Sequence, residues 1–142
     1  MNLIISIRPK YINEMRKNIK KYEFRKNIFK KKVDKIFIYS TNPVKKIVGY
    51  VNYSYFFEGK PEDIWEKTKE HAGISKDKYM EYFDHKKKAF AIDFSDIYFF
   101  ENPINPYEEI KNFRAPQSFM YFEGEFKWEV SHYGMIQSKK MK

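Results

Sequence analysis

The chain has 142 residues, of which 28 are Lys or Arg, 19 are Asp or Glu and none is cysteine. This length predicts a single domain with a real hydrophobic core, and the lack of cysteine excludes disulfides and thiolate zinc sites. The sequence contains no apolar run of the about 20 residues that a transmembrane helix needs, and its start lacks a secretory pattern. We therefore expect a cytoplasmic protein with no membrane partner.

The positive charge is concentrated in the first third of the chain. Residues 1–50 carry 14 basic and three acidic residues, a net charge of +11, whereas the remaining residues have a net charge of −2. A general bias toward lysine would spread the basic residues evenly and would not remove acids from one region. The asymmetry favours a polyanion partner, nucleic acid first, over a membrane surface or an acidic protein.

The chain begins with a predicted strand and helix. Residues 3–7 are an apolar run typical of a short buried strand. Residues 11–20 place Ile12, Met15 and Ile19 on one face of a helix. An extended segment is expected to follow from Tyr22.

Two further strands are predicted before the middle of the chain. Residues 35–40 are continuously apolar, which is typical of a strand covered on both faces, and a turn follows at residues 41–43. Residues 46–57 predict the longest strand, in which Gly49 indicates a bulge or bend.

Two helices are predicted next. Pro61 and the acids after it indicate a helix start. The residues expected on the inner face of this helix are Ile64, Trp65, Thr68 and Ala72. Ser75 is predicted to cap a second short helix, which carries Tyr79, Met80 and Phe83.

The last third predicts a second long strand over residues 88–100, bent near residues 95–96. We expect a helical turn at residues 107–111 and a short helix over residues 115–122, started by Pro116. Residues 126–130 are a candidate edge strand.

Short helices between long, curled strands favour an α+β class, with a small mixed β-barrel and helices packed outside it. We expect one domain over residues 1–136 and a frayed tail over residues 137–142.

The most informative stretch joins the first helix to the next strand. From Tyr22 the residues alternate, so that Tyr22 and Phe24 can enter a core while Lys21, Glu23 and Arg25 share the opposite face. Lys20 can lean over that same face. The simplest alternative is a solvated strand with a surface Glu–Arg pair, which would be worth roughly 0–1 kcal/mol.

The residues Ser6-Ile-Arg-Pro-Lys-Tyr11 and the run Asn18-x-Lys20-x-x-Glu23-x-Arg25 resemble the ASCH family of the PUA-like superfamily. The family pattern after the first helix is Gly-x-Lys-x-x-Glu-x-Arg. Asn18 stands where glycine is usual, and asparagine is the best substitute for glycine at a left-handed helix end.

The resemblance implies a small β-barrel with a cleft in which Lys20, Glu23 and Arg25 face a bound nucleotide. It also implies an RNA-linked role, as an RNA-binding or coactivator-type module or as a nuclease. One branch of the family removes acetyl groups from N4-acetylcytidine, and its pattern has threonine where this chain has Glu23.

These residue types suit a nucleotide. Arg25 can contact a phosphate or base edge with two hydrogen bonds, Lys20 supplies a positive charge, and Glu23 can accept from an exocyclic amine. The other residues expected at the nucleic acid are Arg8, Lys10, Tyr11, Lys21, Ser40, Thr41, Gln117 and Ser118. Tyr11, Tyr22, Tyr53 and Tyr55 offer stacking faces, although core packing explains most tyrosines in so aromatic a chain.

The sequence therefore predicts an RNA-binding domain that recognises a nucleotide or modified base. One alternative is a small enzyme of the amidohydrolase or nuclease type, with Lys20 and Glu23 as catalytic residues. Another is a protein-interaction adaptor with a basic face. We expect no cofactor and no metal site, because His71, His85 and His132 are too widely spaced to be ligands at helical spacing.

Overall fold

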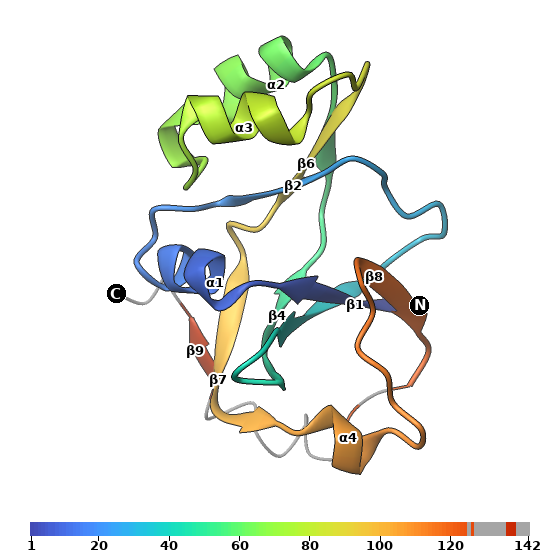
Figure 1. The fold of residues 1–142 in the computed structure, drawn as a ribbon. Coiled ribbons are helices and arrows are strands. Elements are labelled where there is room, and N and C mark those ends of the chain that lie inside the picture. The colour runs from blue at the N-terminus through green and yellow to red at the C-terminus, as the bar shows by residue number, and fades with distance from the viewer. Residues whose placement is uncertain (125, 127–135, 139–142) are drawn as a thin grey trace. The chain divides into compact units, whose positions relative to one another are not determined.

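A computed structural model describes residues 1–124, 126 and 136–138 (Figure 1). These residues form one six-stranded sheet, in the order β8-β1-β3-β4-β7-β9, and one three-stranded sheet, in the order β2-β6-β5. The strands are β1 (Asn2–Ile7), β2 (Tyr22–Arg25), β3 (Lys35–Ser40), β4 (Lys46–Asn52), β5 (Phe56–Gly59), β6 (Ala89–Asp93), β7 (Ile97–Ile104), β8 (Phe119–Phe122) and β9 (Ile136–Ser138). The helices are α1 (Pro9–Arg16), α2 (Pro61–Thr68), α3 (Lys76–Tyr82), α4 (Pro106–Glu109) and the 3-10 helix η1 (Lys69–His71).

The chain divides into two compact units. Unit 1 consists of Met1–Ile12, Lys31–Tyr53 and Asp96–Lys142, and unit 2 consists of Asn13–Lys30 and Ser54–Ser95. The six-stranded sheet belongs to unit 1 and the three-stranded sheet to unit 2. That residues 1–136 form one domain stays a prediction. Of the predicted tail, residues 137 and 138 are in β9, and residues 139–142 lie outside the described residues.

Unit 1 is built around the parallel pair β1 and β3, whose register runs from Leu3 opposite Ile36 to Ile7 opposite Ser40. Both strands are buried almost throughout, which confirms the two buried strands predicted here. The core residues beside them are Ile4, Phe37, Tyr39, Ile47, Tyr50, Phe100, Ile104, Phe113 and Phe126. Because the two strands are parallel, their carboxyl ends meet at the same edge of the sheet.

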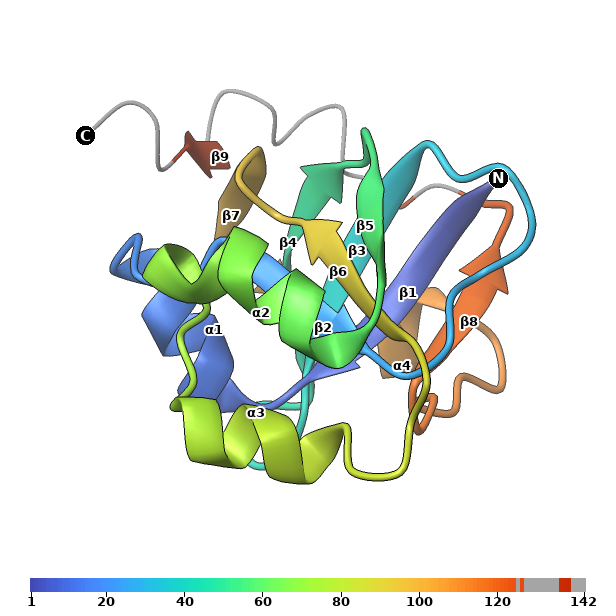
Figure 2. The same cartoon turned by 90° about the horizontal axis from the view of Figure 1, so that it is seen from above.

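In unit 2, α2 packs against β5 and β6 (Figure 2). Ile64, Trp65 and Thr68 of the predicted inner face are buried residues of α2, whereas Ala72 is also buried but follows η1, because α2 ends at Thr68. The predicted cap of α3 is confirmed, because the Ser75 hydroxyl accepts a hydrogen bond of 3.2 Å from the Lys78 N–H. The core residues are Phe24, Ile64, Trp65, Ala72, Tyr79, Phe83, Ala89 and Ala91.

The two long strands of the sequence prediction are each divided in the structure. Residues 46–57 form β4 and the first half of β5, and residues 88–100 form β6 and the first half of β7; β4 and β7 lie in one sheet, and β5 and β6 in the other. β6 ends where the Asp93 carboxylate accepts hydrogen bonds from the Ser95 N–H and hydroxyl, at 2.8 and 2.6 Å. The bulge expected at Gly49 is confirmed by a register shift, and a Cβ at this position would overlap the Tyr98 carbonyl oxygen.

The predicted α+β class is confirmed, but the predicted small mixed β-barrel is not, because the described residues form two sheets and no closed barrel. Within the described part of the chain both sheets are open, one ending at β8 and β9 and the other at β2 and β5. The short connections between β4 and β5 and between β6 and β7 explain the difference. At each of them the chain leaves one sheet and enters the other.

Two predicted helices differ from the structure. Residues 119–122 of the expected last helix form β8, which pairs antiparallel with β1 from Asn2 opposite Phe122 to Ile5 opposite Phe119. Pairing with β1 outweighs the helix-start signal of Pro116. The first helix ends at Arg16, so Ile19 is 47% exposed and does not join Ile12 and Met15 in the core. Of the candidate edge strand 126–130, residues 127–130 lie outside the described residues.

Candidate functional site

The residues of the ASCH-like run lie on β2 and on the loop that leads into it, all in unit 2. Asn18 has φ 65°, the left-handed conformation expected at its position. Lys21 is half-buried, and its backbone is held on both sides: its N–H donates to the His71 carbonyl at 2.9 Å, and its carbonyl accepts from the Phe94 N–H at 2.8 Å. This loop therefore has a fixed conformation from which β2 begins.

Glu23 and Arg25 form a nearly buried ion pair on β2. The Arg25 Nε and Nη2 atoms both donate to Glu23 Oε2, at 3.0 and 2.9 Å. The two side chains are only 10% and 11% exposed, so the pair is not the solvated surface pair of the alternative interpretation. Both hydrogen bonds use Oε2, and Glu23 Oε1 has no hydrogen-bond partner among the described residues.

Lys20 is buried, and its ammonium does not project from the surface beside Glu23 and Arg25. Its Nζ donates to the Ala72 carbonyl at 3.0 Å and lies 4.7 Å from the centre of the Phe24 ring. Burial lowers the pKa of Lys20, the Glu23 carboxylate partly offsets this shift, and Arg25 adds to it. A lysine with a lowered pKa loses its proton more readily and can then serve as a base or nucleophile.

A second group of predicted residues lies in unit 1, at the carboxyl ends of β1 and β3. The Thr41 N–H donates to the Ile7 carbonyl at 3.1 Å. The segment before β8 is held against Ser6, whose N–H donates to the Ser118 carbonyl at 3.0 Å and whose hydroxyl donates to the Pro116 carbonyl at 2.7 Å. The structure therefore brings Ser40, Thr41 and Ser118 to one edge of the sheet.

Ser40 is the unusual member of this group, because its side chain is buried and only 2% exposed. Within the described residues its hydroxyl has no hydrogen-bond partner. A buried polar group without a partner typically costs about 1–3 kcal/mol, so such groups in folded proteins usually face water or a ligand.

The remaining predicted residues are mostly at the surface. Arg8, Lys10 and Gln117 are exposed, and Tyr11 is half-buried with the Lys10 ammonium 5.9 Å from its ring centre. Among the stacking candidates, Tyr22 packs against Phe57, with ring centres 6.0 Å apart.

Sequence reasoning missed Ser6 and Gly73. Gly73 has φ 65°, and a Cβ there would lie 2.5 Å from Lys20 Cβ. The one available signal was a glycine following two residues, His71 and Ala72, that have no turn character. Ser6 belongs to the segment Ser6 to Tyr11 that carries the family resemblance, but no site role was predicted for it because it lies inside an apolar strand.

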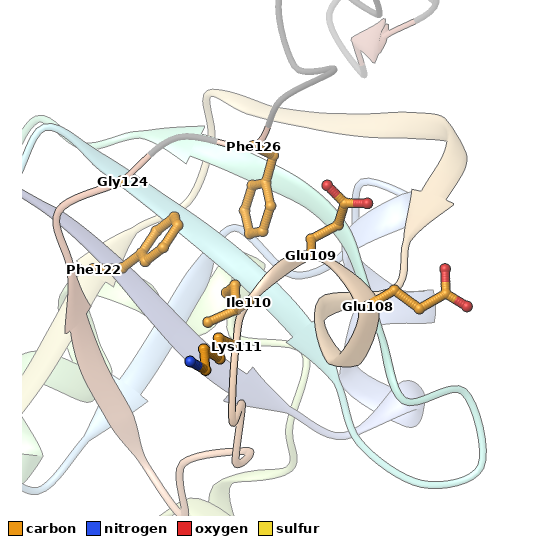
Figure 3. Close-up of a pocket in the computed structure, with 7 residues that line it drawn as sticks. All are labelled: Glu108, Glu109, Ile110, Lys111, Phe122, Gly124 and Phe126. Atoms are coloured by element: carbon orange, nitrogen blue, oxygen red, sulfur yellow. The ribbon is translucent and has the colours of Figure 1, made fainter.

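A hollow of about 380 Å³ lies elsewhere in unit 1, and none of the predicted site residues lines it. Figure 3 shows the Phe122 and Phe126 rings and Ile110 facing one another, while the Glu108 carboxylate points away. The residues that line the hollow are Glu108, Glu109, Ile110, Lys111, Phe122, Gly124 and Phe126.

The described residues contain no cluster of three or more His, Cys, Asp or Glu side chains that could hold a metal ion. His132 lies outside them. No helix formed by these residues is long and apolar enough to cross a membrane.

Similar proteins were found by sequence. The chain is 30% identical over 129 residues to an ASCH domain-containing ribonuclease of Zymomonas mobilis subsp. mobilis, covering 86% of this chain and 84% of that protein. It is also 30% identical over 125 residues to the large ribosomal subunit protein uL22 of Ureaplasma parvum serovar 3, covering 85% of this chain and 39% of that protein. No family model matches the chain.

Similar proteins were also found by structure. The crystal structure of the ASCH protein from Zymomonas mobilis superimposes with a TM-score of 0.76 at 27% identity and covers 92% of each chain. A mutant of that protein with a tyrosine replaced by phenylalanine gives a TM-score of 0.78 at 25% identity, covering 93% of this chain and 97% of the other.

Proposed function

This chain belongs to the ASCH domain family, and from that premise we propose that it binds RNA and cleaves it. The Zymomonas relative is named a ribonuclease. The regional charge agrees with an RNA substrate, because residues 1–50 carry a net charge of +11 and the phosphate backbone is the main source of nucleic-acid affinity. The name of this relative favours the nuclease alternative over RNA binding alone, while the charge supports RNA contact in either case.

The observation that carries the proposal is the arrangement of Glu23 and Arg25. Arg25 holds one carboxylate oxygen, Oε2, through two hydrogen bonds, which leaves Oε1 oriented and without a protein partner in the described residues. An oriented carboxylate oxygen can accept the proton of a hydroxyl that attacks phosphorus. As the new P–O bond forms, the P–O bond to the leaving oxygen breaks and water protonates that oxygen, while a guanidinium stabilises the negative charge that develops on the phosphate. We assign Glu23 as general base and Arg25 as phosphate contact.

Lys20 has a different role in this proposal. Its ammonium is directed at the Ala72 carbonyl and the Phe24 ring, so it contributes as a positioning residue that fixes the start of β2. The Glu23 carboxylate raises the pKa of Lys20 and partly offsets the effect of burial. The polar edge of unit 1, with Ser40, Thr41 and Ser118, is a further candidate for RNA contact in its own right.

The test uses a fluorescent single-stranded RNA of about twelve nucleotides and DNA of the same sequence, each incubated with Mg²⁺ and separately with EDTA. Denaturing gels then report cleavage. We expect wild type to cut the RNA, and Glu23→Gln to cut it at least about 10²-fold more slowly, since a general base contributes 10²–10⁴-fold. The DNA shows whether the ribose 2′-hydroxyl is required.

The matched control is Lys67→Ala. Lys67 is an exposed lysine of the same unit, and the proposal gives it no role. It should cleave like wild type, while identically purified Glu23→Gln reports any contaminating nuclease. RNA binding without cleavage would support the binding prediction alone. If wild type neither binds nor cleaves the RNA, the proposal is refuted and the adaptor alternative remains.

The amidohydrolase alternative has less support. Glu23 stands where the deacetylating branch of the family has threonine, and the curated ASCH relative is a ribonuclease. Release of acetate from N4-acetylcytidine at high protein concentration would reverse this preference.

A further inference from the structure

Tyr82 and Lys26 form an exposed aromatic and cationic pair in unit 2. Tyr82 is the last residue of α3 and is 37% exposed, whereas Tyr79 and Phe83 beside it are buried. The Lys26 ammonium lies 4.5 Å from the centre of the Tyr82 ring. Neither residue takes part in the assignment of Glu23 and Arg25 given above.

The tyrosine is anchored next to that ion pair. Its hydroxyl donates a long hydrogen bond of 3.5 Å to the carbonyl of Phe24, the residue between Glu23 and Arg25. Its ring meets the buried Phe83 ring edge-on, with centres 4.7 Å apart. Lys26 directly follows Arg25 at the end of β2. The exposed ring and the ammonium are therefore fixed at the same end of the strand that carries the ion pair.

This combination suits an unpaired nucleotide. A base that is not stacked in a duplex can lie on an exposed aromatic ring. The Lys26 ammonium, which lies over the Tyr82 ring, can move from the ring to the adjoining phosphate when the base enters. In double-stranded RNA the bases are stacked inside the helix and cannot reach such a ring. A cation over an aromatic ring occurs about once per 70–80 residues in proteins, so the pair alone is not informative. Its exposure and its anchoring to the Phe24 carbonyl are what distinguish it.

Building on the proposed function, we propose that Tyr82 and Lys26 form a stacking platform for an unpaired RNA nucleotide next to the one held at Glu23 and Arg25. The Tyr82 ring receives the base and Lys26 contacts the neighbouring phosphate. The platform selects single-stranded RNA, or a loop, over a duplex.

The platform is tested by fluorescence anisotropy with a labelled hexauridylate and a blunt twelve-base-pair RNA duplex. Tyr82→Ala should bind the hexauridylate roughly 5- to 140-fold more weakly, the range expected for the loss of one stacked base. Tyr82→Phe keeps the ring and should stay within about twofold of wild type. Lys26→Ala should lower the slope of log Kd against log salt by about 0.7.

Two matched controls separate the platform from a general loss of surface residues. Tyr107 is 47% exposed in unit 1, and the Lys67 ammonium lies 5.2 Å from the Phe57 ring in unit 2. Tyr107→Ala and Lys67→Ala should bind the hexauridylate within about twofold of wild type. Circular dichroism melts confirm that each variant is folded.

A second measurement identifies the contact directly. A series of hexauridylates carries one abasic nucleotide at each position in turn. At the position that stacks on Tyr82, the losses of binding free energy from the abasic nucleotide and from Tyr82→Ala should not add, because both changes remove the same contact.

Each outcome decides between the two proposals. Full additivity at every position, or equal losses for the duplex and the hexauridylate, would overturn the platform. Binding by Tyr82→Ala at wild-type strength, with loss in Arg25→Ala, would overturn the platform and leave the proposed function intact. No RNA binding by wild type would overturn both.

Discussion

Gly73 lies directly against the aliphatic part of Lys20: a Cβ at position 73 would be 2.5 Å from Lys20 Cβ and 2.8 Å from Cγ. Gly73 also has φ 65°, a conformation that side chains with a Cβ rarely adopt. Gly73→Ala should therefore strain the backbone and displace the Lys20 side chain, at a cost of about 1–3 kcal/mol in the free energy of unfolding. Urea unfolding measures this cost.

Gly59→Ala is the control for that experiment. The nearest atom to a Cβ at Gly59 is Ile64 Cδ1 at 3.5 Å, an ordinary contact distance. We expect no loss of stability, and a gain of up to about 1 kcal/mol from the reduced freedom of the unfolded chain. Equal effects of the two substitutions would show that the close contact with Lys20 is not what makes Gly73 necessary.

The buried amine of Lys20 predicts a pH dependence of stability. Burial lowers the pKa of Lys20 in the folded protein below the ordinary value of 10.5. At pH values between this lowered pKa and 10.5, the unfolded chain binds more protons than the folded protein does. The free energy of unfolding should therefore rise with pH in that window. Lys20→Met removes the group. The stability difference, wild type minus variant, should shift in favour of wild type as pH increases from about 7 to about 10.

Urea unfolding at several pH values checks this prediction. Tyr79, whose pKa burial raises, acts in the opposite direction at high pH, but it is present in both proteins and its effect cancels. A difference that stays constant over the whole range would mean that Lys20 is charged and unperturbed in the folded protein.

Local patterns predicted the parts of the structure that local chemistry determines. The alternation of Tyr22 to Arg25 correctly placed Phe24 in the core and Glu23 beside Arg25, because a strand has a period of two. Ser75 was recognised as a helix cap for the same reason, since the capping hydrogen bond joins residues three apart.

The rest depended on contacts between distant residues. The partner of the Lys20 ammonium is the Ala72 carbonyl, 52 residues away, so the burial of this lysine could not be seen in its own segment. Pro116 gave a helix-start signal for the segment that includes residues 119–122, and pairing with β1 makes these residues a strand. Likewise, nothing in the composition of residues 88–100 shows that β6 and β7 enter different sheets.

Arg25→Ala and Lys30→Ala together test whether Arg25 contacts only phosphate, as assigned above, or also contacts a base. If Arg25 contacts a base, Arg25→Ala should cost about 1–3 kcal/mol and relax the preference at one position of the RNA. Lys30 is exposed, and Lys30→Ala should weaken binding to all sequences evenly and lower the salt slope by about one. Anisotropy titrations with a small set of RNA sequences at two salt concentrations measure both effects. Equal, sequence-independent losses would show that Arg25 contacts only phosphate.

Ser40 and Ser6 allow a paired test of the polar edge of unit 1. The Ser6 hydroxyl donates to the Pro116 carbonyl at 2.7 Å, so Ser6→Ala should cost about 1–3 kcal/mol in the free energy of unfolding and loosen the segment before β8. The buried Ser40 hydroxyl has no partner among the described residues, so Ser40→Ala should leave stability unchanged or raise it.

RNA binding and cleavage by Ser40→Ala then show whether the Ser40 hydroxyl contacts RNA. A buried hydroxyl that only reduces stability should be replaceable by alanine without effect on RNA binding or cleavage. If it faces substrate, Ser40→Ala should weaken RNA binding about 5- to 12-fold, the loss of one hydrogen bond worth about 1–1.5 kcal/mol, while urea unfolding shows an equally or more stable protein. Because the free energy of unfolding and RNA affinity would then move in opposite directions, a general loss of folding could not account for the result.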